Sequence, residues 1–344
     1  MPTSSDRPRR SPWWWFAVAI SLANAAGVLG FFALRFLLPR LPAPLALISY
    51  GGPFLFAPLL LLLPLAFLLR SRAAAISTMA VLVLFAVLYG PLFVPRLAPA
   101  PALTGEPLSV MTFNLGAYRA PPERLVSVIE SENADVVAVQ ELVPATARAL
   151  RDGLGTRYPY TILEPTAADT GLLSRHPIVA SERFRPAGFG RLALHTVLDI
   201  NGRLVQVIVV HPRPPGFRWR RRWPLAVGVS YDALSKEITD VARRAAALPG
   251  PVLVLGDLNI SEQTPAYDRL AGVLGDTFRE AGWGFGLTFP YRLQIDGTVV
   301  PRPLVRIDYV FHSSELYVRE ARVGCRGGSD HCYVVARLQR ILER

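Results

Sequence analysis

Three long uncharged stretches dominate the first third of the chain. Residues 13–34, 45–69 and 73–94 contain no Asp, Glu, Lys or Arg. As a helix rising about 1.5 Å per residue, each is long enough to cross a hydrocarbon core of about 30 Å. The prolines within 45–69 are compatible with a kinked membrane helix. We therefore predict that residues 1–94 form a membrane anchor with three transmembrane helices.

The pattern changes after residue 94. Residues 95–107 are rich in proline and lack hydrophobic periodicity, which predicts a semi-rigid linker. From residue 108 to 344, short apolar runs alternate with amphipathic stretches, which predicts one globular domain. Strands are expected at 108–114, 135–141, 171–173, 191–200, 203–210, 252–255, 306–311, 320–324 and 333–338, and helices at 122–132, 145–152 and 225–248.

Strands outnumber helices in this domain, and the connections are of two kinds. Asn201-Gly202 is typical of a tight hairpin turn, whereas the predicted helices are long enough to connect parallel strands. This mixture predicts an α/β fold with two packed, mainly antiparallel sheets and helices outside them. An all-α transmembrane region would precede it.

Arginine dominates the charge. Lys and Arg number 37 against 26 Asp and Glu, a formal net charge of +11, and Lys236 is the only lysine. A basic balance favours anionic partners such as nucleic acid, phosphates or anionic lipid. A solvated, arginine-rich surface explains the same numbers, so composition alone does not choose between these interpretations.

The arginines also bear on topology. Three lie in the amino-terminal tail and two flank the short loop at 70–72, whereas Arg40 lies between the first two apolar runs. Because positive residues favour the cytoplasmic side, the tail and the second loop are expected inside. Three spans then place the domain after residue 94 outside the cytoplasm. We therefore expect a multi-pass membrane protein whose globular domain lies outside the cytoplasm.

Cys325 and Cys332 are the only cysteines. They are too few, and wrongly spaced, for a structural zinc site. If the short segment between them joins two antiparallel strands, the thiols could pair in an oxidising compartment. Two unpaired buried thiols fit the sequence as well, and both possibilities stay open.

Several predicted strands end on residues that can bind a metal, a proton or a phosphate. They are Asn114, Glu141, His211, Asp257 and Asn259, and the carboxyl-terminal part adds Asp308, Asp330 and His331. Core packing does not require this coincidence. Carboxylate and carboxamide oxygens suit a hard divalent ion such as Mg²⁺ or Mn²⁺. A pairing of Asp308 with His331 would fix the imidazole tautomer and raise its basicity.

Six short motifs, in order TFN, VQE, VVH, GDLN, RIDYV and GSDH, resemble the endonuclease/exonuclease/phosphatase superfamily. This group includes type I deoxyribonucleases, abasic-site endonucleases, inositol polyphosphate 5-phosphatases and neutral sphingomyelinases. The resemblance extends over residues 109–338, which is nearly the whole predicted domain. It implies a four-layer α/β sandwich, in agreement with the pattern of strands and helices.

The resemblance also implies a metal site. Glu141 would be the main ligand of Mg²⁺ or Mn²⁺, with Asn114 beside it and Asp330 contributing. Asp257 would orient or deprotonate the attacking water, and Asn259 would hold the water or the phosphate.

Two histidines complete the implied site. His331, paired with Asp308, would contact the scissile phosphate or transfer a proton. His211 would lie against the phosphate or the leaving group. The implied reaction is in-line attack of water on a phosphate ester, with the metal and imidazoles stabilising the developing charge.

Structural interpretations remain for the same residues. Asn114 could cap a strand end, residues 257–259 could build a turn, and Asp308 could pair with Arg306. The run 329–331 could be a polar hairpin loop. The other histidines, His176, His195 and His312, are interpreted as structural.

Two further stretches bear on the substrate. After His211, residues 212–223 alternate arginines with aromatic residues. That pattern suits nucleic acid, an anionic membrane surface or a solvated loop equally. The stretch 282–290 is rich in glycine and aromatic residues and could rim the site, with Trp283 or Phe285 facing a substrate.

Together these observations predict a membrane-anchored, divalent-metal-dependent phosphoesterase. Its substrate would be a phosphodiester or phosphomonoester, either nucleic acid or a lipid or sugar phosphate. An endonuclease acting on DNA or RNA is the alternative within the same chemistry. A non-catalytic membrane binding protein that retains the fold is the alternative of a different class. No protein partner can be inferred from the sequence.

Overall fold

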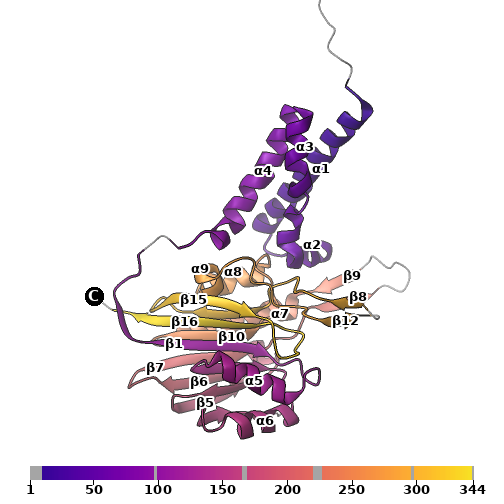
Figure 1. Cartoon of the computed structure of the whole chain (residues 1–344). Coiled ribbons are helices and arrows are strands. Elements are labelled where there is room, and N and C mark those ends of the chain that lie inside the picture. The colour runs from indigo at the N-terminus through magenta and orange to yellow at the C-terminus, as the bar shows by residue number, and fades with distance from the viewer. Residues whose placement is uncertain (1–9, 97–98, 165–168, 220–226, 296–297, 343–344) are drawn as a thin grey trace, which may run out of the picture. The chain divides into compact units, whose positions relative to one another are not determined.

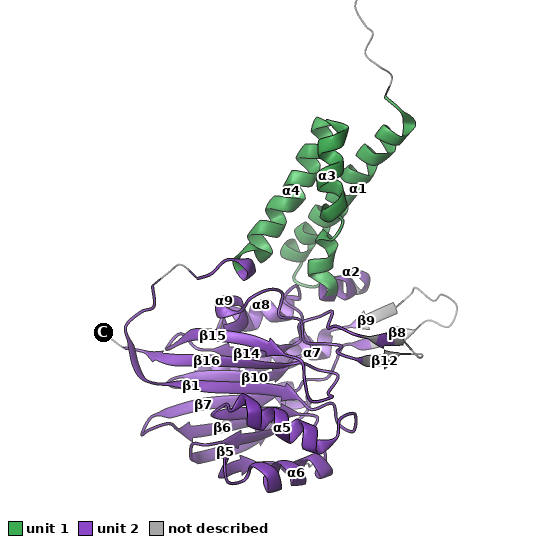
Figure 2. Cartoon of the chain, viewed as in Figure 1, with its two compact units in different colours: residues 1–41, 51–91 green, residues 42–50, 92–344 purple. Residues whose placement is uncertain are grey.

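The computed structural model describes residues 10–96, 99–164, 169–219, 227–295 and 298–342 (Figure 1). Its chain divides into two compact units that alternate along the sequence (Figure 2). One unit comprises residues 1–41 and 51–91, and the other comprises residues 42–50 and 92–344.

Apolar helices make up the first unit. They are α1 (Pro12–Leu37), α3 (Leu59–Leu69) and α4 (Arg72–Tyr89). The side chains of Ser11 and Ser71 cap α1 and α4 by accepting backbone N–H groups in the first turn. Among the described residues, 12–37 and 72–93 are each long and apolar enough to cross a membrane.

The second uncharged run is broken. It holds α2 (Ala43–Ile48), the 3₁₀ segment η1 (Ser49–Phe56) and α3, and the two helical stretches are bent by 50°. Gly51 has non-helical dihedrals and Pro58 lacks the N–H that would continue the helix. Counting the bent pair as one span gives up to three candidate spans in the described residues.

The second unit is built on two sheets, each with six strands among the described residues. In the first, the strand order is β15-β16-β1-β2-β4-β3. Its strands are β1 (Leu103–Asn114), β2 (Val136–Gln140), β3 (Tyr160–Ile162), β4 (Gly171–Ser174), β15 (Leu316–Gly324) and β16 (Tyr333–Ile341). β1 and β2 run parallel and are connected by α5 (Pro122–Glu132).

The second sheet has the order β11-β14-β10-β7-β6-β5. Its strands are β5 (Ile178–Phe184), β6 (Ala193–Asp199), β7 (Leu204–Val210), β10 (Val252–Asp257), β11 (Gly275–Asp276) and β14 (Asp308–His312). β7 and β10 run parallel, connected through α7 (Asp232–Ala247). Both parallel pairs therefore present their carboxyl ends at one edge of their sheet.

Alternation along the strands produces four layers. Val110 and Leu253 belong to a core shared by the two sheets, whereas their neighbours Met111 and Val254 pack in two outer cores. One outer core is covered by α5 and α6 (Pro144–Leu154), the other by α7 and α8 (Pro265–Ala271). Successive side chains of a strand point to opposite faces, so each buried strand serves two layers. The predicted four-layer sandwich is confirmed.

Smaller elements complete the unit. The ribbons are β8 (Gly216–Trp219) with β9 (Val227–Ser230), and β12 (Leu293–Ile295) with β13 (Thr298–Val300). The short helical turns are η2 (Gly90–Phe93), η3 (Pro186–Gly188) and α9 (Thr277–Ala281).

Several elements differ from the sequence expectation. β1 begins at Leu103, inside the expected linker, because Leu103 and Thr104 pair with Ile341 and Arg340. The helix expected from residue 225 begins at Asp232, after strand β9. The edge strand β5 was not expected, because its apolar residues cluster at its start and do not alternate with polar residues along the strand.

The sequence left open whether the two cysteines pair, and in the structure they do. Cys325 and Cys332 form a disulfide across the turn between β15 and β16. This turn carries Ser329, Asp330 and His331, so the disulfide closes the loop that presents three polar residues of the predicted site.

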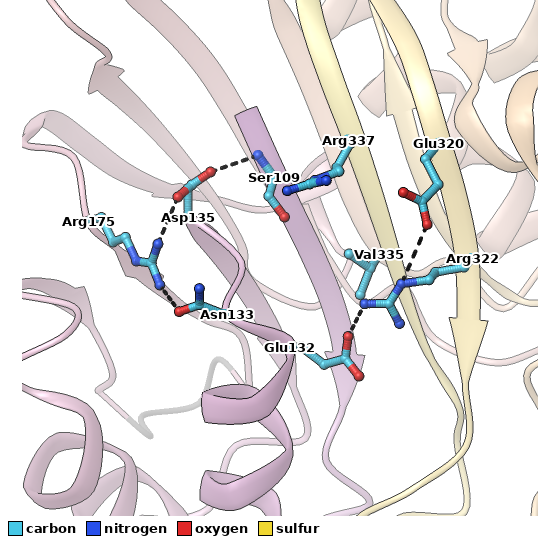
Figure 3. Close-up of a pocket in the computed structure, with 9 residues that line it drawn as sticks. All are labelled: Ser109, Glu132, Asn133, Asp135, Arg175, Glu320, Arg322, Val335 and Arg337. Atoms are coloured by element: carbon cyan, nitrogen blue, oxygen red, sulfur yellow. Dashed lines mark hydrogen bonds and ion pairs between the residues drawn. The ribbon is translucent and has the colours of Figure 1, made fainter. Parts of the chain in front are cut away.

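A polar cavity of about 330 Å³ lies against the first sheet, lined by residues such as Ser109 and Val335 (Figure 3). Several of its charged groups are paired: Asp135 accepts from the Ser109 N–H and from Arg175, and Arg322 binds Glu132 and Glu320. This cavity is electrically balanced by its own side chains and contains none of the predicted catalytic residues among those described.

Candidate active site

The site forms where the carboxyl ends of the parallel strands of both sheets meet. Asn114 ends β1, and Glu141 directly follows β2. In the second sheet, His211 directly follows β7 and Asp257 ends β10. The Asn114 amide Nδ2 donates to Asp257 Oδ2 at 3.0 Å, which joins the two sheets at this point.

Asp257 is the centre of the arrangement. The side chain is buried, and its Oδ2 lies 3.6 Å from His211 Nε2 and 3.8 Å from His331 Nε2. Its Oδ1 accepts the backbone N–H of Asn259 at 3.0 Å. Burial raises the pKa of Asp257, and the charge of Asp308 raises it further against the opposing effect of the two imidazoles.

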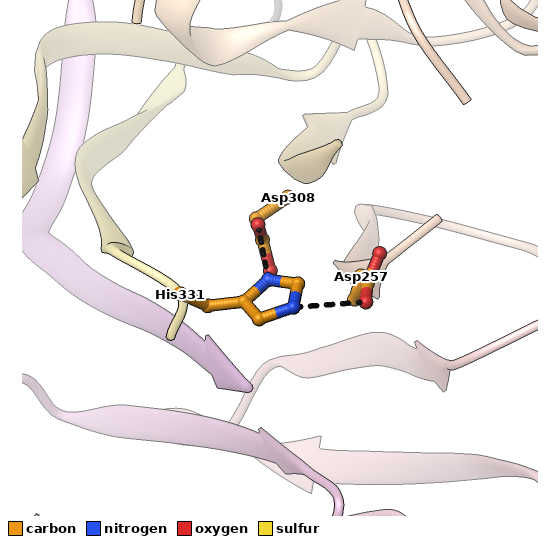
Figure 4. A group of neighbouring side chains, drawn as sticks. All are labelled: Asp257, Asp308 and His331. Carbon is orange, nitrogen blue, oxygen red and sulfur yellow. Dashed lines mark hydrogen bonds and ion pairs between the residues drawn. The ribbon is translucent and has the colours of Figure 1, made fainter. Parts of the chain in front are cut away.

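The His331 imidazole is held by a carboxylate. His331 Nδ1 lies 3.0 Å from Asp308 Oδ2 (Figure 4), which is the contact that the sequence motifs suggested. Burial alone would lower the pKa of His331, but the charges of Asp308 and Asp257 and the hydrogen bond to Asp308 raise it to about 10. His331 is therefore a cation at neutral pH in this environment.

Asp308 is available for this contact because Arg306 has other partners. Arg306 Nη1 donates to Asp276 Oδ1 at 3.1 Å, and its Nη2 lies 2.7 Å from Glu262 Oε1. The alternative pairing of Asp308 with Arg306 is therefore not the one present. Ser329 holds the His331 loop by donating to the Asn114 carbonyl at 2.7 Å and accepting the His331 N–H at 3.0 Å.

His211 has a carboxylate partner that the sequence did not reveal. Its Nδ1 lies 2.8 Å from Asp169 Oδ2, and Arg191 Nη1 lies 3.0 Å from either ring nitrogen. Burial would lower the pKa of His211, yet the hydrogen bond to Asp169 and the charges of Asp257 and Asp169 raise it overall. Asp257 thus lies between two imidazoles, each backed by an aspartate.

Asp169 belongs to none of the six sequence motifs, but the strand topology explains its position in the site. It lies two residues before β4, which runs antiparallel to β2. The amino end of an antiparallel strand lies at the carboxyl end of its neighbour, so Asp169 arrives at the same edge as Glu141. Recognising β4 as antiparallel is the signal that could have found it.

Glu141 and Asp330 are one pair of carboxylates that could hold a divalent ion. Asp330 Oδ2 contacts Arg119 Nε at 3.1 Å, while its buried Oδ1 has no hydrogen-bond partner among the described residues. Burial raises the pKa of Asp330 and the charge of Glu141 adds to this. An orphaned carboxylate oxygen beside a second carboxylate fits a hard cation such as Mg²⁺.

Asn114 fits this ion less directly. Its Oδ1 accepts the Gly116 N–H at 3.0 Å, and its Nδ2 lies 3.4 Å from Glu141 Oε1. In this orientation Asn114 presents a donor to the carboxylates, and ligation through Oδ1 requires the amide to turn. Its role as a ligand remains a prediction.

A second group of potential ligand atoms, on Asp257, Asp308 and His331, lies within 4.8 Å of one another. Two of these residues already bind each other through Asp308 Oδ2 and His331 Nδ1. Asp308 Oδ1 is buried and has no hydrogen-bond partner among the described residues, so this group is a second candidate site for an ion.

A cavity of about 500 Å³ opens over these residues. Its polar floor contains Glu141, His211, Asp257, Asn259, Asp330 and His331, with Arg119 and Arg191 beside it. Its walls are largely apolar and include Pro214, Pro215, Phe289, Pro290, Leu304 and Val305. The arrangement can therefore hold a phosphate group on the floor while the walls exclude water from part of the substrate.

The three remaining histidines lie outside the site. His195 is buried and contacts Gln206 at 2.9 Å, His312 contacts Glu280 at 3.0 Å, and His176 closes a local turn with Ser174, so all three are structural as expected.

The two substrate-related stretches give a mixed outcome. From the stretch 282–290, Phe289 and Pro290 line the cavity. Trp283 and Phe285 instead pack against Phe93, with ring centroids 6.2 and 5.2 Å apart, and are not among the described lining residues. The expectation that either ring faces the substrate is wrong for this structure. Of the basic run 212–223, residues 220–223, which include three of its five arginines, lie outside the described residues.

Comparison with known proteins agrees with this geometry. The family model described as "Endonuclease/Exonuclease/phosphatase family" matches residues 111–331. No curated protein sequence matches the chain.

Among solved structures, an endonuclease/exonuclease/phosphatase from Bacteroides vulgatus is 17% identical with a TM-score of 0.54, covering 69% of this chain and 100% of its own. Sphingomyelinase C from Streptomyces griseocarneus is 19% identical with a TM-score of 0.50, covering 68% and 99%. TDP2 of D. rerio, complexed with single-strand DNA product, is 16% identical with a TM-score of 0.54, covering 68% and 99%. At these identities the structures share the fold with this chain.

Proposed function

This chain belongs to the endonuclease/exonuclease/phosphatase family, and from that premise we propose that it is a membrane-anchored, divalent-metal-dependent hydrolase of phosphate esters. Members of the family are hydrolases that act on phosphoesters. The observation that carries the proposal is the position of Asp257 between two imidazoles that are each paired with a buried or half-buried aspartate.

The residues suit in-line attack of water on phosphorus. Asp257 accepts a proton from the attacking water, whose oxygen forms the new bond to phosphorus. His331, a cation held by Asp308, donates a hydrogen bond to a non-bridging phosphate oxygen as negative charge develops there. His211 donates its proton to the leaving-group oxygen as the phosphorus–oxygen bond breaks. Asn259 would hold the water or the phosphate.

Glu141 and Asp330 would hold Mg²⁺ or Mn²⁺, with Asn114 as a further ligand if its amide turns. When bound, such an ion supplies positive charge beside the phosphate. The apolar helices of the first unit would anchor the protein in a membrane, with the catalytic unit outside the cytoplasm. The substrate would be a phosphomonoester or phosphodiester of a lipid, a sugar or a nucleic acid.

Asp257→Asn tests the catalytic role. It preserves the side-chain volume but removes the proton acceptor, so we expect hydrolysis of bis-p-nitrophenyl phosphate to fall about a thousandfold or more. The assay uses the full chain with Mg²⁺ or Mn²⁺, and supercoiled plasmid and a phospholipid panel are tested in parallel. Asp199→Asn, in the exposed turn where Asp199 accepts the Gly202 N–H, is the matched control.

Near-wild-type turnover by Asp257→Asn would overturn this mechanism. Metal dependence is tested by EDTA, which should abolish hydrolysis until Mg²⁺ or Mn²⁺ is returned. Plasmid nicking that disappears in Asp257→Asn would assign the endonuclease alternative. Binding of a phosphate ester without turnover would favour the non-catalytic alternative.

A further inference from the structure

The catalytic cavity has a wall that comes from outside the family-matched part of the chain. Leu47 and Tyr50 line it together with the polar floor. The family match begins at residue 111, far downstream of them. Residues 42–50, here called the connector, nevertheless belong to the same compact unit as the two sheets (Figure 2).

Tyr50 ties the connector to the catalytic loop. Its hydroxyl donates to the backbone carbonyl of Asn259 at 2.6 Å, and its ring stacks on Tyr231 with centroids 5.9 Å apart. Asn259 itself has a left-handed backbone (φ 51°) and donates its N–H to Asp257. A contact from the connector therefore supports the turn that fixes Asp257 Oδ1.

Two more hydrogen bonds hold the connector in place. Ser261 Oγ donates to the carbonyl of Ser49 at 2.8 Å, and the Tyr231 hydroxyl donates to the carbonyl of Ala46 at 3.2 Å. Ala46 and Ser49 are buried, and α2 lies against β9. The connector is thus integrated into the catalytic unit through both its backbone and its side chains.

The exposed face of the connector is apolar where it meets the cavity. Leu47 is 41% exposed and lines the cavity with Leu304, Val305 and the prolines 214 and 215. None of these side chains can bind a phosphate or a sugar hydroxyl. A substrate group that packs here gains by removing aliphatic surface from water.

We propose that the connector is a specificity-determining wall of the active site and that it selects phosphate esters carrying an aliphatic substituent. The polar floor binds the phosphate, and the substituent packs against Leu47 and the facing apolar side chains. This inference rests on the proposed phosphoesterase function and adds the class of substrate. It gives residues 42–50 a role in substrate selection, with Tyr50 as a positioning residue for Asn259.

A series of alkyl p-nitrophenyl phosphodiesters, from methyl to hexyl, tests this inference. All members share one leaving group, so differences in kcat/KM report the alkyl contacts. We expect kcat/KM of the full chain in detergent to rise roughly threefold per methylene. Leu47→Asn should reduce the hexyl-to-methyl ratio of kcat/KM at least tenfold. A ratio within one preparation does not depend on the fraction of folded enzyme.

Ile48→Asn is the matched control. Ile48 is the next residue, is 40% exposed and is not among the described lining residues, so its variant should keep the wild-type ratio. A flat dependence on chain length, or an unchanged ratio in Leu47→Asn, would overturn the inference while leaving the proposed function intact. If the enzyme hydrolysed none of the esters, both this inference and the proposed function would be overturned.

Tyr50→Phe provides a second, milder variant. It retains the ring but removes the hydrogen bond to the Asn259 carbonyl, so we expect kcat for the methyl ester to fall about fivefold with little change in KM. Tyr160→Phe, on the edge strand β3, is the control. A wild-type kcat in Tyr50→Phe would overturn the positioning role of Tyr50.

Discussion

At the scale of single residues, the proposed mechanism depends on the aspartate that supports each imidazole. His211 is held between the carboxylate of Asp169 and the guanidinium of Arg191, which have opposite effects on its pKa. Because the proposed role of His211 needs the protonated ring, its activity is present below this pKa and is lost as the pH rises through it.

Asp169→Asn should therefore lower the pKa of His211 and move the alkaline limb of the kcat/KM profile to lower pH. We also expect kcat at neutral pH to fall about tenfold or more, because the ring loses its orienting carboxylate. Arg191→Met should move the same limb to higher pH, because Arg191 lowers the pKa. The pH–rate profile of both variants is the measurement, and shifts in the same direction would contradict this account.

Some residues of the site could be predicted from the sequence and others could not. Asn114, Glu141, His211 and Asp257 were found because each ends or follows a strand with a clear apolar pattern. Asp169 and Arg191 each lie two residues before a strand, β4 and β6, and only the direction of that strand places them at the site. Strand direction depends on long-range pairing, which local patterns do not encode.

At the scale of elements, the parallel pair of β7 and β10 depends on one glycine. Gly256 pairs with Val210 and has φ +154°, and a Cβ at this position would contact the Val210 carbonyl oxygen. The close approach of the two backbones places His211 and Asp257 side by side. Only glycine allows this approach without displacing one strand.

Gly256→Ala should therefore lower the free energy of unfolding by about 2–4 kcal/mol and reduce activity together with stability. Urea unfolding followed by tryptophan fluorescence measures this change. Gly216→Ala is the control, because a Cβ at Gly216 meets nothing closer than 4.0 Å. Equal stabilities of the two variants would show that the strands have room for a side chain.

Elements that the sequence missed either lie at the edge of a sheet or are short. β5 is an exposed edge strand, and α8 and α9 have 7 and 5 residues. Elements with long apolar periodicity, such as α5, were predicted to the residue. Local sequence patterns therefore predict long, buried helices and strands better than edge strands and short helices.

At the scale of the whole molecule, the predicted membrane topology has a direct test. The arginine distribution predicts that the amino-terminal tail is inside and the catalytic unit is outside the cytoplasm. Protease added to intact spheroplasts should then digest the chain after residue 94 while an amino-terminal tag survives. A cytoplasmic marker in the same sample is the control, and full protection of the catalytic unit would contradict the predicted orientation.

Hydropathy assigns residues 45–50 to an apolar run, yet the structure places them in the catalytic unit. The sequence has no signal for this, because the connector is apolar both as a membrane segment and as a pocket wall. Its assignment depends on single hydrogen bonds, such as that of Tyr50 to Asn259, between residues distant along the chain.

The discontinuous catalytic unit has a practical consequence for dissection of the protein. A truncated fragment that begins at the proline-rich segment would keep both sheets and both imidazole–aspartate pairs but would lose Leu47 and Tyr50. Such a fragment would report the chemistry of phosphate-ester cleavage without its selectivity. A substrate profile measured on it would then look broader than that of the intact enzyme, and screening for the natural substrate should begin with the full-length chain.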